Sequence, residues 1–274
     1  MLQDVLRGAP TEIDAICGAV VKADAYGIGI EAAVPALLAA GCKTFFVAHA
    51  SEGVRTRAVA PDATIYVLNG LPPAAVPVMI EYRLRPVLGS HEDAQIWAKA
   101  ADRLPCALHV DTGMNRLGLS STDDLSGLSI QTVMSHLASA DEDVDQTAQQ
   151  LQAFQALAAR HPGAALSLSN SAGICLGPDY HFDLTRPGLA LYGGVPRREA
   201  VGQIKRVVRI EAQILQRRRI QPGDSVGYNA TFRASEPREL AILNLGYADG
   251  YVRGFSGKGS AENGQFPVLG RVSM

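Results

Sequence analysis

AVVKADAYGIG, residues 19–29, is the stretch that decides the fold. Its apolar start indicates a buried strand, and its two glycines, Gly27 and Gly29, indicate a loop that turns tightly. The charge of Lys22 is costly at the end of a buried strand, because lysine is almost never fully buried without a partner. The stretch therefore predicts a strand whose end carries either a solvated lysine or a chemically active one.

Similar apolar runs alternate with helix-like segments along the first two thirds of the chain. The alternation predicts a parallel sheet covered by helices, and eight such units are what a (β/α)8 barrel requires. An open doubly wound sheet also alternates, but no G-x-G-x-x-G turn is present. The predicted strands are residues 18–23, 44–48, 64–70, 85–89, 106–113, 129–138, 165–170 and 184–194. The clearest predicted helices are residues 31–41, 91–104 and 145–161.

The pattern changes after the eighth strand. From about residue 205, polar and apolar residues alternate between Pro-Gly turns, and no long helical segment follows. This texture is typical of a mostly β region. We therefore expect two domains, a barrel over residues 1–200 and a C-terminal β domain over residues 201–274.

Composition excludes several classes of protein. The 274 residues carry a net charge of −2, which gives no electrostatic footprint for nucleic acid or an anionic membrane. No apolar run reaches the roughly 18 residues that span a bilayer, and residues 1–20 lack a signal-peptide pattern. The four cysteines are scattered without a C-x-x-C pair, which favours a reduced, cytoplasmic protein and no metal site.

Polar residues gather where the predicted strands end, which is where a barrel of this kind builds its active site. These residues are Lys22, the segment 111–118, Ser135 and His136, the segment 169–171, and the segment 186–188. Each has a simple structural explanation, such as a solvated lysine, a core His136, a helix cap, or an Arg186 paired with Asp183 or Asp111. Together they favour a Schiff-base lysine with a phosphate-bearing aldehyde cofactor.

Several segments, in order, resemble the signature segments of alanine racemases, which use pyridoxal 5′-phosphate (PLP). The resemblance covers nearly the whole chain, from about residue 15 to residue 274. It implies a homodimer whose active site, shared between subunits, interconverts L-alanine and D-alanine. The segments are AVVKADAYGIG, HVDTGMNRLG, MSHLASAD, LSNSAGI, RPGLALYGG, VGYNATFRA, LGYADGYVR and VLGRVSM.

The resemblance also implies a role for individual residues. Lys22 would bind PLP covalently and act as one catalytic base, and Tyr228, entering from the partner subunit, would be the second base. Two bases on opposite faces explain the inversion of a Cα centre. A chain from Tyr228 through His136 to Arg186 would lower the tyrosine pKa toward a useful range.

The remaining implied contacts divide between cofactor and substrate. Tyr26, Ser171, Gly188 and Leu189 would hold the phosphate, and Arg186 would face the pyridine nitrogen. Substrate contacts are implied for Arg116, which would also touch the cofactor's phenolic oxygen. Tyr247 and Arg253 would belong to the substrate entrance, and Met274, again from the partner subunit, would lie at the substrate carboxylate. His109 stands where many members carry a lysine, and Ile28 where many carry a histidine; Asp24 has no assigned role.

The resemblance leaves three alternatives. A broad-specificity racemase and a PLP decarboxylase share the barrel, but the decarboxylase phosphate segment, of Gly-Glu-Pro-Gly-Arg type, is absent. A non-catalytic PLP-binding protein of the single-barrel type would lack the predicted β domain. The ends of the sequence also lack segments usual in the family, so we expect the chain to be part of a longer protein. For the truncated chain alone, the alternative is a non-catalytic PLP-binding protein that holds PLP weakly.

Overall fold

The structure, a computed structural model, describes residues 16–123, 125–261 and 264–274. Residues 1–15, in which the sequence shows no signal-peptide pattern, lie outside the described residues. The chain divides into two compact units, the first ending at Val208 and the second covering Arg209–Met274.

The first unit contains an eight-stranded sheet in the order β7-β6-β5-β4-β3-β2-β1-β8, and every paired neighbour is parallel. The ring closes between β7 and β8, where the Arg186 amide donates to Ser169 O at 2.8 Å and the Asp183 amide donates to Leu166 O at 3.1 Å. The predicted barrel is therefore confirmed. Its strands are β1 (Ile16–Val20), β2 (Thr44–Val47), β3 (Thr64–Val67), β4 (Arg85–Leu88), β5 (Pro105–His109), β6 (Ser129–Met134), β7 (Ala165–Ser167) and β8 (Leu184–Thr185).

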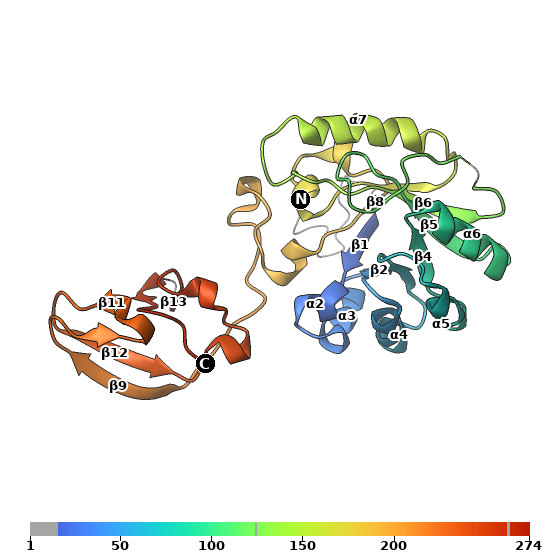
Figure 1. Cartoon of the computed structure of the whole chain (residues 1–274). Coiled ribbons are helices and arrows are strands. Elements are labelled where there is room, and N and C mark those ends of the chain that lie inside the picture. Colours follow the sequence, from blue (N-terminus) through green and yellow to red (C-terminus); the bar gives the residue numbers. More distant parts are fainter. Residues whose placement is uncertain (1–15, 124, 262–263) are drawn as a thin grey trace. The chain divides into compact units, whose positions relative to one another are not determined.

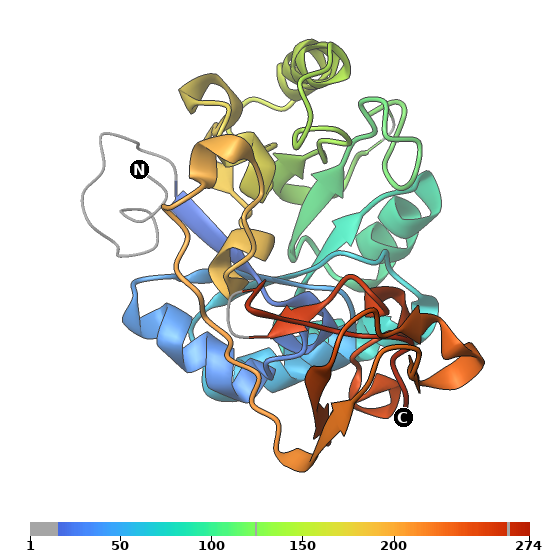
Figure 2. The same ribbon diagram turned by 90° about the vertical axis from the view of Figure 1, so that its left-hand side faces the viewer.

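Helices lie around the outside of the strands (Figures 1 and 2). Two of the described α-helices, α6 (His91–Ala100) and α8 (Ser171–Ile174), begin at a side-chain cap. At α6, Ser90 Oγ accepts a hydrogen bond from the Asp93 amide at 3.0 Å. Apart from the short α2 (Lys22–Tyr26), the described α-helices are α3 (Ile30–Ala39), α4 (Ala50–Val59), α5 (Val76–Glu81), α6 (His91–Ala100), α7 (Gln146–Ala158) and α8 (Ser171–Ile174). The 3-10 helices are η1 (Pro73–Ala75), η2 (Pro178–Tyr180), η3 (Leu189–Tyr192) and η4 (Arg198–Ala200).

Both faces of the strands are buried, which explains their continuous apolar character. Alternate residues point to opposite faces of a strand, so most of the strands contribute to two separate cores. The inner core takes one residue from each of seven strands: Val20, Phe46, Tyr66, Val87, Ala107, Met134 and Leu184. The outer core, between strands and helices, includes Phe45, Val47, Ile65, Leu108 and Val133.

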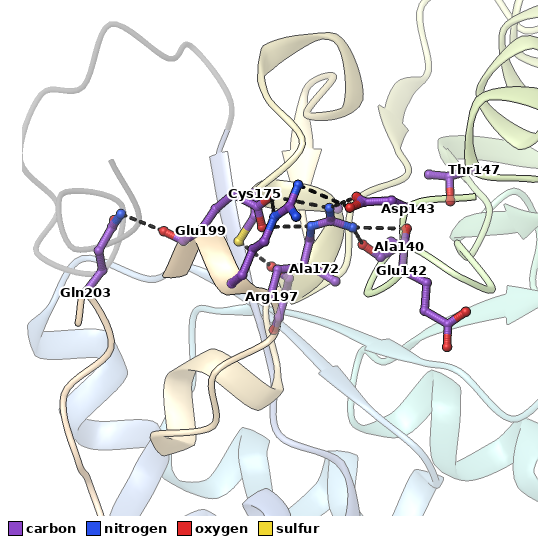
Figure 3. Close-up of polar contacts among 12 residues, drawn as sticks. Ala140, Glu142, Asp143, Thr147, Ala172, Cys175, Arg197, Glu199 and Gln203 are labelled. Carbon is purple, nitrogen blue, oxygen red and sulfur yellow. Dashed lines mark hydrogen bonds and ion pairs between the residues drawn. The ribbon is translucent and has the colours of Figure 1, made fainter. Parts of the chain in front are cut away.

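One buried arginine ties the segment after the barrel to the loop after β6 (Figure 3). The Arg197 guanidinium donates to Ala140 O at 2.6 Å and to Glu142 O at 3.1 Å, and it pairs with the carboxylates of Asp143 and Glu199. Its side chain is 4% exposed. We call these five residues the Arg197 cluster.

The second unit is mostly β, as predicted. Its longest pair is antiparallel, formed by β9 (Ile214–Ile220) and β12 (Arg238–Leu243). The shorter strands are β10 (Ser225–Val226), β11 (Phe232–Arg233), β13 (Ser260–Ala261) and β14 (Phe266–Pro267), and the 3-10 helices are η5 (Tyr228–Ala230), η6 (Tyr247–Asp249) and η7 (Arg253–Phe255). Among the residues described in both units, none of the helices has the length and apolar character that crossing a bilayer requires.

Candidate active site

Lys22 lies at the carboxyl end of β1, two residues past the last residue of that strand. Its side chain is half-buried, and burial lowers the pKa of the ammonium, an effect that the charge of Arg116 reinforces and that of Glu52 opposes. A lysine with a lowered pKa has a larger neutral, nucleophilic fraction near neutral pH. The environment therefore suits a lysine that reacts.

A short turn, labelled α2 (Lys22–Tyr26) in Figure 1, follows directly. Four consecutive residues, Ala23 to Tyr26, have φ between 53° and 57°, so the turn is left-handed. The Asp24 carboxylate accepts a hydrogen bond from the Ile30 amide at 3.0 Å and pairs with Arg55 at 2.8 Å. Asp24, for which the sequence indicates no role, thus joins this turn to the start of α3.

The turn brings Tyr26 to the residues that follow β7 and β8. Ser171 Oγ accepts hydrogen bonds from the amides of Gly188 at 3.0 Å and Ala190 at 3.2 Å. A methyl group at Gly188 would collide with the Tyr26 hydroxyl. Tyr26, Ser171 and Gly188 therefore form one cradle, with Leu189 next to Gly188 along the chain.

The helix-cap explanation of the segment 169–171 is confirmed for Asn170. Asn170 Oδ1 accepts hydrogen bonds from the amides of Ala172 at 3.1 Å and Gly173 at 2.9 Å, at the start of α8. Because Asn170 already binds these two amides, they are not free for a ligand. A ligand in the cradle would meet the hydroxyl groups of Tyr26 and Ser171 instead. α8 has only four residues, and we assign no anion site to its dipole.

Arg186 is fully buried beside the cradle. Its guanidinium donates to Ser167 Oγ, Ser135 O and Leu168 O, and no carboxylate among the described residues pairs with it. The pairings with Asp183 and Asp111 considered from sequence are wrong: Asp183 accepts the Leu166 amide at 2.8 Å, and Asp111 accepts the amides of the loop that follows it. Burial lowers the pKa of Arg186 to about 10, so it stays charged at neutral pH.

His109, the last residue of β5, and His136, two residues past β6, lie close enough to Arg186 and Arg116 for the two positive charges to act on their imidazoles. Burial, followed by the charges of Arg186 and Arg116, lowers the pKa of His109 to about 4 and that of His136 to about 3. Both imidazoles are neutral at neutral pH. Arg116 itself lies on the exposed loop after β5, close enough to influence Lys22 and both histidines.

These residues fit a phosphate-bearing pyridoxal cofactor. The buried Arg186 guanidinium, which has no carboxylate partner among the described residues, can donate a hydrogen bond to a ring nitrogen. The cradle supplies the hydroxyl groups of Tyr26 and Ser171, and Gly188, which has no side chain, lets a phosphate approach the backbone closely. The Tyr26 hydroxyl makes no hydrogen bond to a described residue, which leaves it available for a phosphate oxygen. Lys22 stands on the same rim, because the ends of parallel strands share one edge of the barrel.

Three supporting residues were missed in the sequence. Tyr192 stacks on Tyr26 with ring centroids 4.7 Å apart and donates to Val20 O at 2.9 Å. The buried Gln150 of α7 donates to Thr112 Oγ1 and His136 O, so it joins the loops after β5 and β6. Glu52 contacts the left-handed turn. Only the position of Glu52, three residues into a capping pattern after a strand, gave a signal in the sequence.

The other predicted site residues lie in the second unit. Tyr228 begins η5 and is 62% exposed. Arg253 stacks over the Tyr247 ring at 5.0 Å, and the Tyr247 amide donates to Ser273 O at 3.0 Å, beside the chain-terminal Met274. The structure thus brings Tyr247, Arg253 and Met274 together. The predicted chain from Tyr228 through His136 to Arg186 stays a prediction, because it joins residues of both units.

Comparison with known proteins identifies the family of this chain. The family model described as "Alanine racemase, N-terminal domain" matches residues 4–196, and "Alanine racemase, C-terminal domain" matches residues 207–274. The alanine racemase of Methylobacterium sp. (strain 4-46) is 51% identical, in an alignment that covers 98% of this chain and 78% of that protein. The biosynthetic alanine racemase of Agrobacterium fabrum is 44% identical over 93% of this chain and 72% of its own length.

Solved structures give the same result. A crystal structure of alanine racemase from Bartonella henselae, with covalently bound pyridoxal phosphate, superposes with a TM-score of 0.87 at 39% identity, covering 100% of this chain and 79% of that one. The biosynthetic alanine racemase from Pseudomonas aeruginosa gives 0.85 at 32% identity, with coverage of 94% and 76%. The chain therefore belongs to the alanine racemase family of isomerases.

Proposed function

We propose that the protein binds PLP through Lys22 and interconverts L-alanine and D-alanine. The observation that carries the proposal is the fully buried Arg186, charged and without a carboxylate partner among the described residues, on the same rim as Lys22 and the Tyr26–Ser171–Gly188 cradle. In this arrangement the cradle would hold the phosphate, and Arg186 would donate a hydrogen bond to the pyridine nitrogen. When bound, PLP withdraws electrons from the substrate Cα and so makes its proton more acidic.

The chain's own residues then move that proton. Lys22 Nζ removes or returns it on one face, a task for which a lowered pKa is favourable. Tyr228 Oη acts on the opposite face. Arg116 attracts the substrate carboxylate, with Met274 of the partner subunit at the same end of the substrate, and Tyr247 and Arg253 line the substrate entrance. Since Arg186 keeps its own proton at neutral pH, the ring nitrogen stays unprotonated, which favours racemisation over side reactions such as transamination.

Tyr228 acts, in this proposal, on the site of a partner subunit. Its exposure supports the assignment, because a residue that serves another chain's site is open in a single chain. Mixing Lys22→Ala chains with Tyr228→Phe chains, with subunits exchanged, tests it directly. In a dimer that contains one chain of each kind, one of the two sites keeps both intact residues. Since half of the dimers in an equal mixture are of this kind, the mixture should recover about a quarter of wild-type activity. No recovery would place Tyr228 in the site of its own chain.

Substrate choice is tested with a panel of enantiomerically pure amino acids. We expect alanine to be racemised in both directions and L-serine, L-lysine and L-arginine to react at least about tenfold more slowly, because each carries a larger side chain. Comparable rates on lysine or arginine would instead assign a broad-specificity racemase.

We also place the protein in the cytoplasm. All four cysteines are free in the described structure, which supports a reducing compartment. Fractionation of cells that express the tagged protein tests this, and recovery in the periplasmic fraction would contradict it.

A further inference from the structure

Glu52, in the first turn of α4, holds three backbone amides from the ends of two neighbouring strands. Its Oε1 accepts the Asp24 amide at 3.0 Å, and its Oε2 accepts the amides of Ala48 at 2.8 Å and His49 at 3.3 Å. Asp24 follows β1, and Ala48 and His49 follow β2. One carboxylate therefore joins the loop after β1 to the loop after β2.

The loop after β1 needs such a tie. Left-handed backbone costs roughly 1–2 kcal/mol per residue outside glycine, and residues 23–26 adopt it in succession. Within the turn, the Gly27 amide donates to Ala23 O at 3.0 Å and to Asp24 O at 3.1 Å. The Asp24 amide lies near the start of the left-handed run, and Glu52 fixes it from outside.

We propose that Glu52 is a positioning residue that holds the left-handed turn in place and thereby sets Lys22 and Tyr26 toward the cofactor. This inference rests on the proposed roles of Lys22 and Tyr26. Within the described part of the first unit, the Glu52 carboxylate forms hydrogen bonds to the amides of Asp24, Ala48 and His49 and none to Arg116 or to the cradle residues. Its effect passes through the backbone of Asp24, which lies two residues from both Lys22 and Tyr26.

The charge of Glu52 adds a second, measurable consequence. Burial and the neighbouring Arg116 lower the pKa of Lys22, and the Glu52 carboxylate raises it. His136, two residues past the end of β6, also lies within electrostatic reach of Lys22. Since the Glu52 charge opposes the effects of burial and of Arg116, neutralising it should lower the pKa of Lys22 further.

Glu52→Gln is the test variant, because it keeps the side chain's size but replaces one acceptor oxygen with an NH2 group that cannot accept an amide hydrogen bond. Glu31→Gln is the matched control. The Glu31 carboxylate is exposed and pairs with Arg55, which also contacts Asp24. In the described part of the chain, the Glu31 carboxylate accepts no hydrogen bond from an amide of residues 23–26.

Three measurements are made on the apoprotein: hydrogen exchange of amides 23–29, the pKa of Lys22 from competitive acetylation followed by mass spectrometry, and the dissociation constant for added PLP. For Glu52→Gln we expect about tenfold faster exchange, a lower Lys22 pKa and about tenfold weaker PLP binding. Glu31→Gln should stay within about twofold of wild type. Wild-type values for Glu52→Gln in all three measurements would overturn the inference.

Failure of the proposed function is distinguishable from failure of this inference. If the wild-type chain does not take up PLP at Lys22, the proposed function fails, yet exchange and acetylation still report on the turn without any cofactor. Glu52→Asp provides a second variant if Glu52→Gln does not fold. It keeps the charge but is too short for all three amides, so exchange should rise while the Lys22 pKa stays near the wild-type value; unchanged exchange would contradict the tie.

Discussion

His109 and His136 show how burial and charge act on single residues of this site. Both stand at the ends of barrel strands, and both face arginines that do not lose their protons at neutral pH. Protonating either imidazole would place a further cation in a partly buried, positive environment, so the folded state keeps them neutral down to about pH 4 and about pH 3. The unfolded chain, by contrast, takes up these protons near pH 6.5.

This difference predicts a pH-dependent stability. Because the unfolded state binds more protons between pH 6.5 and pH 4, stability is present above pH 6.5 and is lost as pH falls, by about 1.4 kcal/mol per pH unit for each histidine. Urea unfolding at pH 7 and at pH 5, followed at the transition of the first unit, measures the loss in the free energy of unfolding. His109→Gln should reduce the slope by one histidine's share, and an unchanged slope would show that protonation of His109 is not a cause of the loss.

At the scale of single elements, the left-handed turn predicts an unusual effect of glycine. Ala23 is exposed and has φ of 53°, whereas Ala36 is exposed within the right-handed helix α3. Ala23→Gly should raise the free energy of unfolding by about 0.5–1 kcal/mol, since relief of strain exceeds the entropy cost of glycine. Ala36→Gly should lower it by about 1 kcal/mol. Thermal or urea unfolding compares the two, and equal destabilisation would show that residue 23 is not left-handed.

The strands were largely predictable from sequence, but their ends were not. The predicted starts at residues 44, 64, 85, 129, 165 and 184 agree with the structure, because apolar runs bounded by turns locate buried strands. The predicted strand over 184–194 ends at Thr185, since Pro187 cannot donate to a ladder and Gly188 leads into η3. Apolar character continued past the strand and gave no sign of its end.

The same distinction applies to the site. Lys22, His136 and Arg186 could be found because each interrupts an apolar run at a strand end, where polar residues are costly without a purpose. Gln150 could not, because its role depends on a contact with a residue 38 positions away along the chain. For Glu52 the sequence indicates a helix cap, but not the bond to an amide 28 positions away. Such contacts follow from helix packing, which a single sequence does not specify.

At the scale of the whole first unit, the Arg197 cluster is expected to contribute strongly to stability. Arg197→Met leaves the carbonyl groups of Ala140 and Glu142 without their donor, at a cost of about 2–4 kcal/mol in the free energy of unfolding. Arg198 forms ion pairs with the same carboxylates, but its side chain is 77% exposed. Arg198→Met should therefore cost less than about 1 kcal/mol. Urea unfolding measures both, and similar losses would show that burial is not the cause.

Racemisation of alanine through Lys22 is the central claim about this chain. The most direct measurement follows the circular dichroism of L-alanine, in D2O with PLP added, in the presence of the wild-type chain or Lys22→Ala. We predict that the wild-type signal decays to zero as both enantiomers become equal and the alanine Cα gains deuterium, while Lys22→Ala leaves the signal unchanged. A constant signal with the wild-type chain, while PLP is covalently bound at Lys22, would contradict the claim.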